Sequence, residues 1–180
     1  MKHIFYHLAA VMVVVVWGMT FISTKVLIVH GLSPQEIFLF RFLLAYAAVC
    51  PISFHRFFAR NLKDELYLVG GGVLGGSLFF FLQNIALGLT QASNVSFIIC
   101  MAPLLTAVLT VLSVRTEKVS RGFIYGSIIA LLGVGLLIFN GSFILRISPL
   151  GDLLTLLASL SWAFYSLVIR SLTRKYSPAF

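Results

Sequence analysis

Long apolar runs separated by short polar gaps dominate the hydrophobic pattern of the chain. Residues 66–114 form 49 consecutive positions without an acidic or basic side chain. That is too long for one membrane crossing, which takes about 20 helical residues, and it suits two crossings joined at the polar cluster 88–94. The other apolar stretches are 7–29, 34–54, 122–145 and 153–169. The pattern therefore predicts an all-α integral membrane protein, a bundle of six membrane-spanning helices.

Composition strengthens this interpretation. The chain of 180 residues is 60% hydrophobic and 10% charged, with a mean hydropathy of +1.06, whereas soluble domains are about 45–50% apolar and about 25% charged. A water-soluble domain and a large catalytic domain outside the membrane are both excluded. The net charge of +8 lies in the short gaps between apolar runs, so we expect no nucleic-acid partner. We expect no cofactor or metal either, because both cysteines lie inside apolar runs.

The distribution of basic residues predicts one orientation. Ten of the 13 Lys and Arg residues flank one side of the predicted spans, two (Lys25 and Arg146) flank the other, and Arg41 lies within a span. Basic residues in short loops stay on the cytoplasmic side. The N-terminus is therefore predicted to be cytoplasmic, and a ten-to-two bias argues against insertion in both orientations.

The first and sixth predicted helices share a pattern of an aromatic, a small and a basic residue. Trp17-Gly18 precedes Lys25, and Trp162-Ala163 precedes Arg170 at an offset of 145. Chance similarity between two apolar helices is the alternative. A true repeat would have five helices over 1–145, with a second, inverted copy beginning in 146–180. On this interpretation the chain is truncated after about six of about ten helices.

The sequence resembles the EamA-type transporters of the drug/metabolite transporter superfamily over nearly its whole length. The matching motifs are Trp17-Gly18 with Phe21 and Lys25, Arg41-Phe42-Leu43-Leu44-Ala45, Ala86-Leu87 with Thr90, Ala92 and Ser93, Pro103-Leu104, Glu117-Lys118-Val119-Ser120, Gly126, Gly133-Val134, and Gly151-Asp152 to Trp162-Ala163-Phe164-Tyr165. The resemblance implies two five-helix inverted copies with both termini inside. It also implies export or uptake of small metabolites across the bacterial inner membrane.

Arg41 is the first candidate for contact with a solute. It lies about 10 Å into its predicted helix at 1.5 Å per residue, where an arginine is costly unless it is paired, snorkels or faces water. The alternative is an anchor that pairs with Glu36. Lys25 near the outer end of the first helix is either an interfacial anchor or, with Arg41, part of a positive vestibule for anionic solutes.

Further polar and small residues complete the predicted substrate site. Helix 93–113 carries a stripe of Ser, Thr and Cys on one face, which is either a packed seam or a pathway lining, and Pro103 can kink that helix. Glycine pairs 71/75 and 72/76 favour close helix packing. The expected substrate-binding residues are Trp17, Thr20, Thr24, Arg41, Gln83, Asn84, Ser93, Ser96 and Pro103.

The predicted function is secondary-type transport of small metabolites, amino-acid-like or other small organic solutes, by alternating access. An enzyme is not expected, because all four histidines lie at helix ends or in loops. No Walker motif is present, so ATP is not expected to drive transport. The expected partners are the solute and the lipid bilayer. A half-carrier subunit or a non-transporting membrane scaffold stays open as the alternative, and so does a homodimer or a missing second half.

Overall fold

The computed structural model describes residues 2–53, 61–113, 120–139, 148–173 and 176, and within these ranges the chain is helical with no strand. This confirms the all-α class. The elements are α1 (Lys2–Val29), α2 (Pro34–Ser53), α3 (Leu62–Gly71), a π-helix η1 (Gly72–Leu78), α4 (Phe79–Leu89), α5 (Ala92–Ile99), α6 (Ala102–Ser113), α7 (Arg121–Phe139) and α8 (Pro149–Leu172).

The helices form rods that match the six predicted spans. α3, η1 and α4 make one continuous rod, and α5 and α6 make a second, interrupted rod. Four rods in the described residues are long and apolar enough to cross a membrane: Ile4–Val29, Leu62–Leu89, Ala92–Ser113 and Pro149–Leu172. The remaining helices, α2 and α7, have 20 and 19 residues. The last part of the predicted span 122–145 lies outside the described residues.

Two predicted helix starts were too late. The third span was expected to begin at 66 and the sixth at 153, but α3 begins at Leu62 and α8 at Pro149. Acidic side chains in the first turn of a helix are favourable, so the first turn can be charged where the span itself cannot. In α3 the Asn61 side chain also accepts a hydrogen bond from the Lys63 backbone N–H at 3.0 Å and caps the helix.

The helix breaks lie at the positions that were predicted from the sequence. The chain leaves helix at Thr90 and Gln91, inside the polar cluster 88–94. A second break at Cys100 and Met101 directly precedes Pro103, whose missing N–H removes one helical hydrogen bond. The disturbance expected from Pro103 is therefore confirmed.

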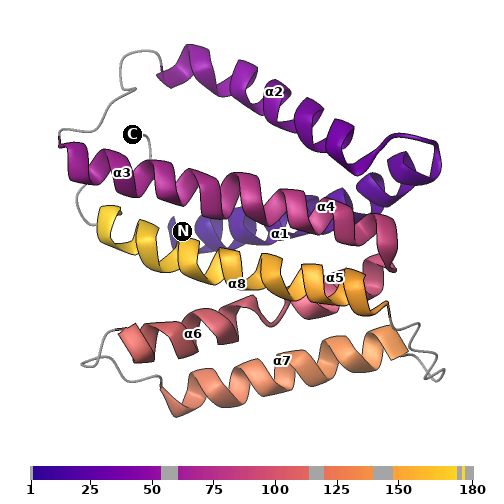
Figure 1. Cartoon of the computed structure of the whole chain (residues 1–180). Helices are drawn as coiled ribbons and strands as arrows, with labels where there is room; N and C mark the ends of the chain where they lie inside the picture. Colours follow the sequence, from indigo (N-terminus) through magenta and orange to yellow (C-terminus); the bar gives the residue numbers. More distant parts are fainter. Residues whose placement is uncertain (1, 54–60, 114–119, 140–147, 174–175, 177–180) are drawn as a thin grey trace.

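α8 runs antiparallel to the α3–η1–α4 rod and lies alongside it (Figure 1). At one end Thr90 Oγ1 donates to Asp152 Oδ1 at 3.3 Å. At the other end the Tyr176 hydroxyl donates to Asp64 Oδ2 at 2.9 Å. α5 and α6 cover another side of α8, and α7 packs on α5 and α6 at the edge of the bundle.

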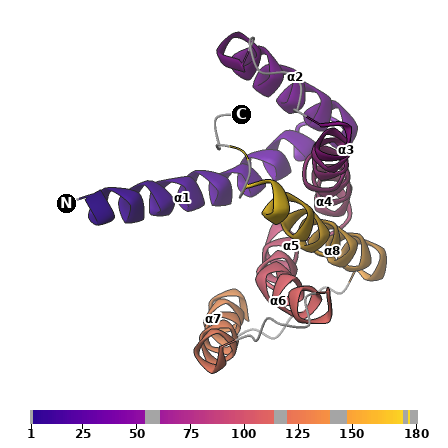
Figure 2. The same cartoon turned by 90° about the vertical axis from the view of Figure 1, so that its left-hand side faces the viewer.

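The first half of α1 lies outside the helix bundle. Figure 2 shows this part extending away from the other helices, and its side chains from Ile4 to Val16 are exposed. Its second half is packed, because Phe21 joins a buried cluster with Ala86, Leu87 and Val95. This second half brings α1 against α4 and toward α8.

Candidate functional site

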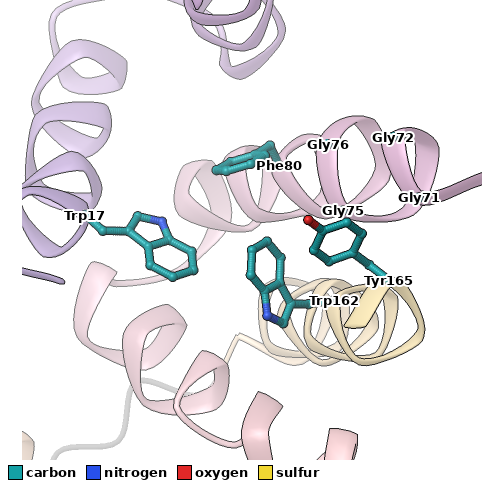
Figure 3. A pocket seen from close by; sticks show the side chains of 8 residues that line it. All are labelled: Trp17, Gly71, Gly72, Gly75, Gly76, Phe80, Trp162 and Tyr165. Atoms are coloured by element: carbon teal, nitrogen blue, oxygen red, sulfur yellow. The ribbon is translucent and has the colours of Figure 1, made fainter. Parts of the chain in front are cut away.

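A cavity of about 420 Å³ lies where α1, the α3–η1–α4 rod and α8 meet (Figure 3). We call it the aromatic cavity. Its lining residues are Trp17, Gly71, Gly72, Gly75, Gly76, Phe80, Trp162 and Tyr165.

Aromatic rings from three helices make the walls of this cavity. The ring centroids of Trp17 and Trp162 are 5.4 Å apart, and those of Trp162 and Tyr165 are 5.1 Å apart. Phe79, which is fully buried, packs behind Trp162 at 4.8 Å. Each ring position is thus restrained by a neighbouring ring at a distance typical of favourable aromatic pairs.

The glycines of α3 and η1 form the opposite wall. A Cβ added at Gly75 would lie 2.5 Å from ring atoms of Tyr165, so only glycine lets the ring approach the backbone this closely. The Ser161 hydroxyl donates to the Leu74 carbonyl oxygen at 2.8 Å and ties α8 to η1. A π-helical segment is rare and is often found at functional sites.

Arg41 lies near this cavity, next to its lining residue Phe80. Its Nη1 donates to Thr24 Oγ1 at 3.3 Å, and its Cζ is 5.5 Å from the Phe80 ring centroid. Thr24 is buried and donates to the Thr20 carbonyl at 2.7 Å. The guanidinium group is therefore held by one hydroxyl and one ring face.

In the described part of the chain, Arg41 and Glu36 form no ion pair, which was the alternative interpretation of Arg41. Glu36 Oε2 instead accepts hydrogen bonds from the Ser33 backbone N–H and from Ser33 Oγ, both at 2.8 Å. The Glu36 backbone N–H donates back to Ser33 Oγ at 3.2 Å, so the two residues form a capping box at the start of α2.

The Lys25 side chain forms hydrogen bonds with backbone carbonyl groups. Its Nζ donates to the Leu87 carbonyl at 2.6 Å and to the Thr90 carbonyl at 2.9 Å. Both carbonyls lie at the C-terminal end of α4, where unpaired carbonyl groups favour a cation. In the described structure this lysine serves as a helix cap.

Gln83 and Asn84 are buried polar residues of α4. In the described residues neither amide atom of Gln83 has a hydrogen-bond partner, and neither has Asn84 Oδ1. Asn84 Nδ2 donates to the Pro34 carbonyl at 3.5 Å. Buried polar atoms without partners cost free energy, so Gln83 offers unused donors and an acceptor one helical turn beyond Phe79.

The predicted site residues divide into two groups. Trp17, Thr24 and Arg41 come together around Phe80, and Thr20 supports Thr24 while its own hydroxyl donates to the Trp17 carbonyl at 2.6 Å. The residues of α5 and α6 do not line the aromatic cavity within the described chain: Ser96 donates to the Ala92 carbonyl at 2.7 Å, Ser93 is partly exposed and Pro103 is exposed.

Of the eight lining residues only Trp17 was in the predicted site. The seven that were missing are the aromatic residues Phe80, Trp162 and Tyr165 and the four glycines, which were expected to serve helix packing. Trp162 and Tyr165 are three positions apart on α8, a spacing that places side chains on one face of a helix, so an aromatic pair could have been recognised from the sequence. Phe80 lies within the run of three phenylalanines 79–81, where no signal distinguishes the inward ring. In the residues that the structure describes, no three His, Cys, Asp or Glu side chains are placed to hold a metal ion.

Comparison with known proteins gives a consistent picture. A family profile described as "EamA-like transporter family" matches residues 4–139. A Bacillus subtilis (strain 168) protein named "Uncharacterized transporter YcxC" is 27% identical over 175 residues, covering 94% of this chain and 55% of that protein. The chain thus spans about half the length of this relative. No solved structure matches the chain.

Proposed function

The chain belongs to the EamA-like transporter family, and from this premise we propose that it carries small organic solutes across the bacterial inner membrane as a secondary-type transporter. It is a multi-pass helical membrane protein, and the family is one of transporters. Alternating access, the cytoplasmic N-terminus and the inner-membrane location are parts of this proposal. That a second, inverted copy of 1–145 begins in 146–180 stays a prediction.

The observation that carries the proposal is Arg41. A guanidinium group at this depth of a span is costly without a partner, and the described residues offer it a hydroxyl and an aromatic ring but no carboxylate. Lys25 differs, because two backbone carbonyls satisfy it. An anionic group of a solute would complete the hydrogen bonding of Arg41 with a charge-assisted pair.

We therefore propose solutes that carry a carboxylate or another anionic group. The buried amide of Gln83 on α4 and the buried hydroxyl of Thr24 on α1 are further polar groups of these two helices. The absence of an acidic residue deep in the described spans supports a facilitator or exchanger for this part of the protein.

The test compares metabolite export and uptake between strains that lack the gene and strains that overproduce the protein. Mass spectrometry of cells and medium needs no prior choice of solute. We expect Arg41→Gln to lower the flux of the anionic solutes so found by about tenfold, because one charge-assisted pair is lost. Arg41→Lys should keep part of the flux.

The matched control is Arg121→Gln, which removes a charge from the exposed first residue of α7 and should leave flux unchanged. The proposal of anionic solutes fails if Arg41→Gln transports every anionic compound at the wild-type rate. A non-transporting scaffold would instead show no flux difference between the deletion and overproducing strains.

A further inference from the structure

We infer that the aromatic cavity is a binding subsite for a planar aromatic ring, so that the solute class is an aromatic carboxylate. The carboxylate part of this inference rests on the proposed function of Arg41, whereas the ring part rests on the cavity alone.

The cavity has the shape and chemistry that a flat ring requires. Trp17 and Trp162 are tilted by 46° to each other, and Trp162 and Tyr165 by 51°, so the walls offer both faces and edges of rings. A further ring can pack on such walls in offset-stacked or edge-to-face geometry. Of the four glycines in the lining, Gly75 is covered by the Tyr165 ring, whereas a Cβ added at Gly72 would meet nothing within 4 Å, so a ligand can approach the backbone at Gly72 (Figure 3).

The lining carries no charged side chain. A charged group of the ligand must therefore project beyond the cavity, and Phe80 shows in which direction. This ring lines the cavity and also lies 5.5 Å from the Arg41 guanidinium carbon. A ring bound beside Phe80 would direct a carboxylate toward Arg41, whereas an organic cation in the same cavity would be repelled by Arg41.

The irregular backbone of η1 contributes Gly72, Gly75 and Gly76 to the lining of the cavity. Non-α backbone at membrane depth is tolerated where it is buried in protein or lines a cavity. A Cβ added at Gly72 of η1 meets nothing within 4 Å, so the space in front of this glycine is open. Gly72 is exposed and lines the cavity, so a side chain introduced at this position would enter open space.

The chain contains two tryptophans, and both line the cavity, so tryptophan fluorescence of the purified full chain in lipid nanodiscs reports on this site. The probe is 4-bromobenzoate, a planar ring with a carboxylate and a heavy atom that quenches tryptophan. We expect saturable quenching that benzoate relieves about tenfold more effectively than cyclohexanecarboxylate, because only a flat ring stacks on the walls. Absence of saturable quenching, or equal competition by the two carboxylates, overturns the inference.

Two glycine variants locate the bound probe. Gly72→Leu places a side chain in the open space of the cavity and should weaken binding of 4-bromobenzoate by about tenfold. Gly70→Leu is the matched control, because a Cβ there also meets nothing within 4 Å but Gly70 does not line the cavity; its affinity should stay within about twofold of wild type. Wild-type affinity in a folded Gly72→Leu protein contradicts the inference.

A second pair covers the case in which Gly72→Leu does not fold. Tyr165→Leu removes one wall, and its control Phe164→Leu changes the neighbouring, exposed ring. Weaker quenching in the first variant and wild-type quenching in the second support the ring subsite. Circular dichroism and gel filtration establish the fold of each variant.

Arg41→Gln separates the inference from the proposed function. If 4-bromobenzoate and uncharged 4-bromobenzyl alcohol bind wild type equally and Arg41→Gln changes neither, the anionic solute class fails and the ring subsite stands. If Arg41→Gln weakens 4-bromobenzoate alone, both stand. If the probe binds but no strain shows solute flux, the ring subsite stands and transport fails.

Discussion

α1 and α8 share a sequence pattern but not an environment. Trp17-Gly18 with Lys25 and Trp162-Ala163 with Arg170 stand at the same offset, and the two tryptophan rings meet each other at 5.4 Å. α8 packs on α3, η1, α4, α5 and α6, whereas the first half of α1 is exposed. The tryptophans of the shared pattern contact each other. The rest of α1 and the rest of α8 lie in different environments.

The residues that differ between the two helices show what packing requires inside a membrane. The buried face of α8 includes the small residues Thr155, Ala158, Ser159 and Ser161, while the exposed part of α1 is rich in valine, leucine and methionine. Lipid is as apolar as leucine, so close approach and hydrogen bonds, rather than hydrophobicity, select the packed face. In α8, small and hydroxyl residues therefore mark the packed face.

The strongest test of this contrast removes one phenylalanine from each region. Phe79→Ala deletes a fully buried ring that packs on Trp162 of α8, and it should lower the free energy of unfolding by about 3 kcal/mol. Phe5→Ala on α1 removes a ring that is 69% exposed and should change it by less than about 0.5 kcal/mol. Unfolding by denaturant in detergent micelles measures both, and equal losses would show that the first half of α1 is packed after all.

An added methyl group gives smaller individual effects, and the two variants are expected to change stability in opposite directions. Gly75→Ala forces its Cβ against the Tyr165 ring of α8 and should destabilise the protein by about 2 kcal/mol. Gly18→Ala on α1 meets nothing within 4 Å and should stabilise the helix by up to about 1 kcal/mol. Thermal unfolding of the two variants side by side checks the signs, and a stable Gly75→Ala protein would place Tyr165 away from η1.

A single hydroxyl group gives the smallest expected effect. Ser161→Ala removes the hydrogen bond from α8 to the Leu74 carbonyl and should cost about 0.6 kcal/mol, the average for such bonds in a membrane protein. Ser23→Ala on α1 removes an exposed hydroxyl that donates to Met19 of its own helix and should cost less than about 0.3 kcal/mol. A cost at Ser23 as large as that at Ser161 would remove the distinction between the two helices.

The rods could be predicted from the sequence because a span needs a fixed length of uncharged chain. The helix breaks near Pro103 and within the cluster 88–94 could likewise be predicted, since proline lacks an N–H and small polar residues favour turns. The first turns of α3 and α8 were not predicted. Their acidic side chains are unfavourable in the bilayer, but negative charge is favourable at the start of a helix.

Less of the site could be predicted, because helix rotation decides which side chains meet. Trp17, Thr24 and Arg41 were recognised as single residues. The spacing of Trp162 and Tyr165 puts both rings on one face of α8, but nothing in the sequence showed that this face meets Phe80 and Trp17. The π-helical hydrogen bonding of η1 forms beside the Tyr165 ring and has no signal of its own in the sequence. The partners of Lys25 are backbone carbonyls 62 and 65 positions away. Every residue has a backbone carbonyl, so the sequence does not show which ones a lysine will contact.

Lys25 also limits how the helices can move. Its ammonium group tethers the end of α1 to the last turn of α4 through two carbonyls, and each such bond to a charged group contributes about 1.5–3 kcal/mol. Rocking these two helix ends apart would break both bonds together. The tethered ends therefore travel as one piece, and any opening between α1 and α4 has to begin at the opposite end, where the first half of α1 already stands clear of its neighbours.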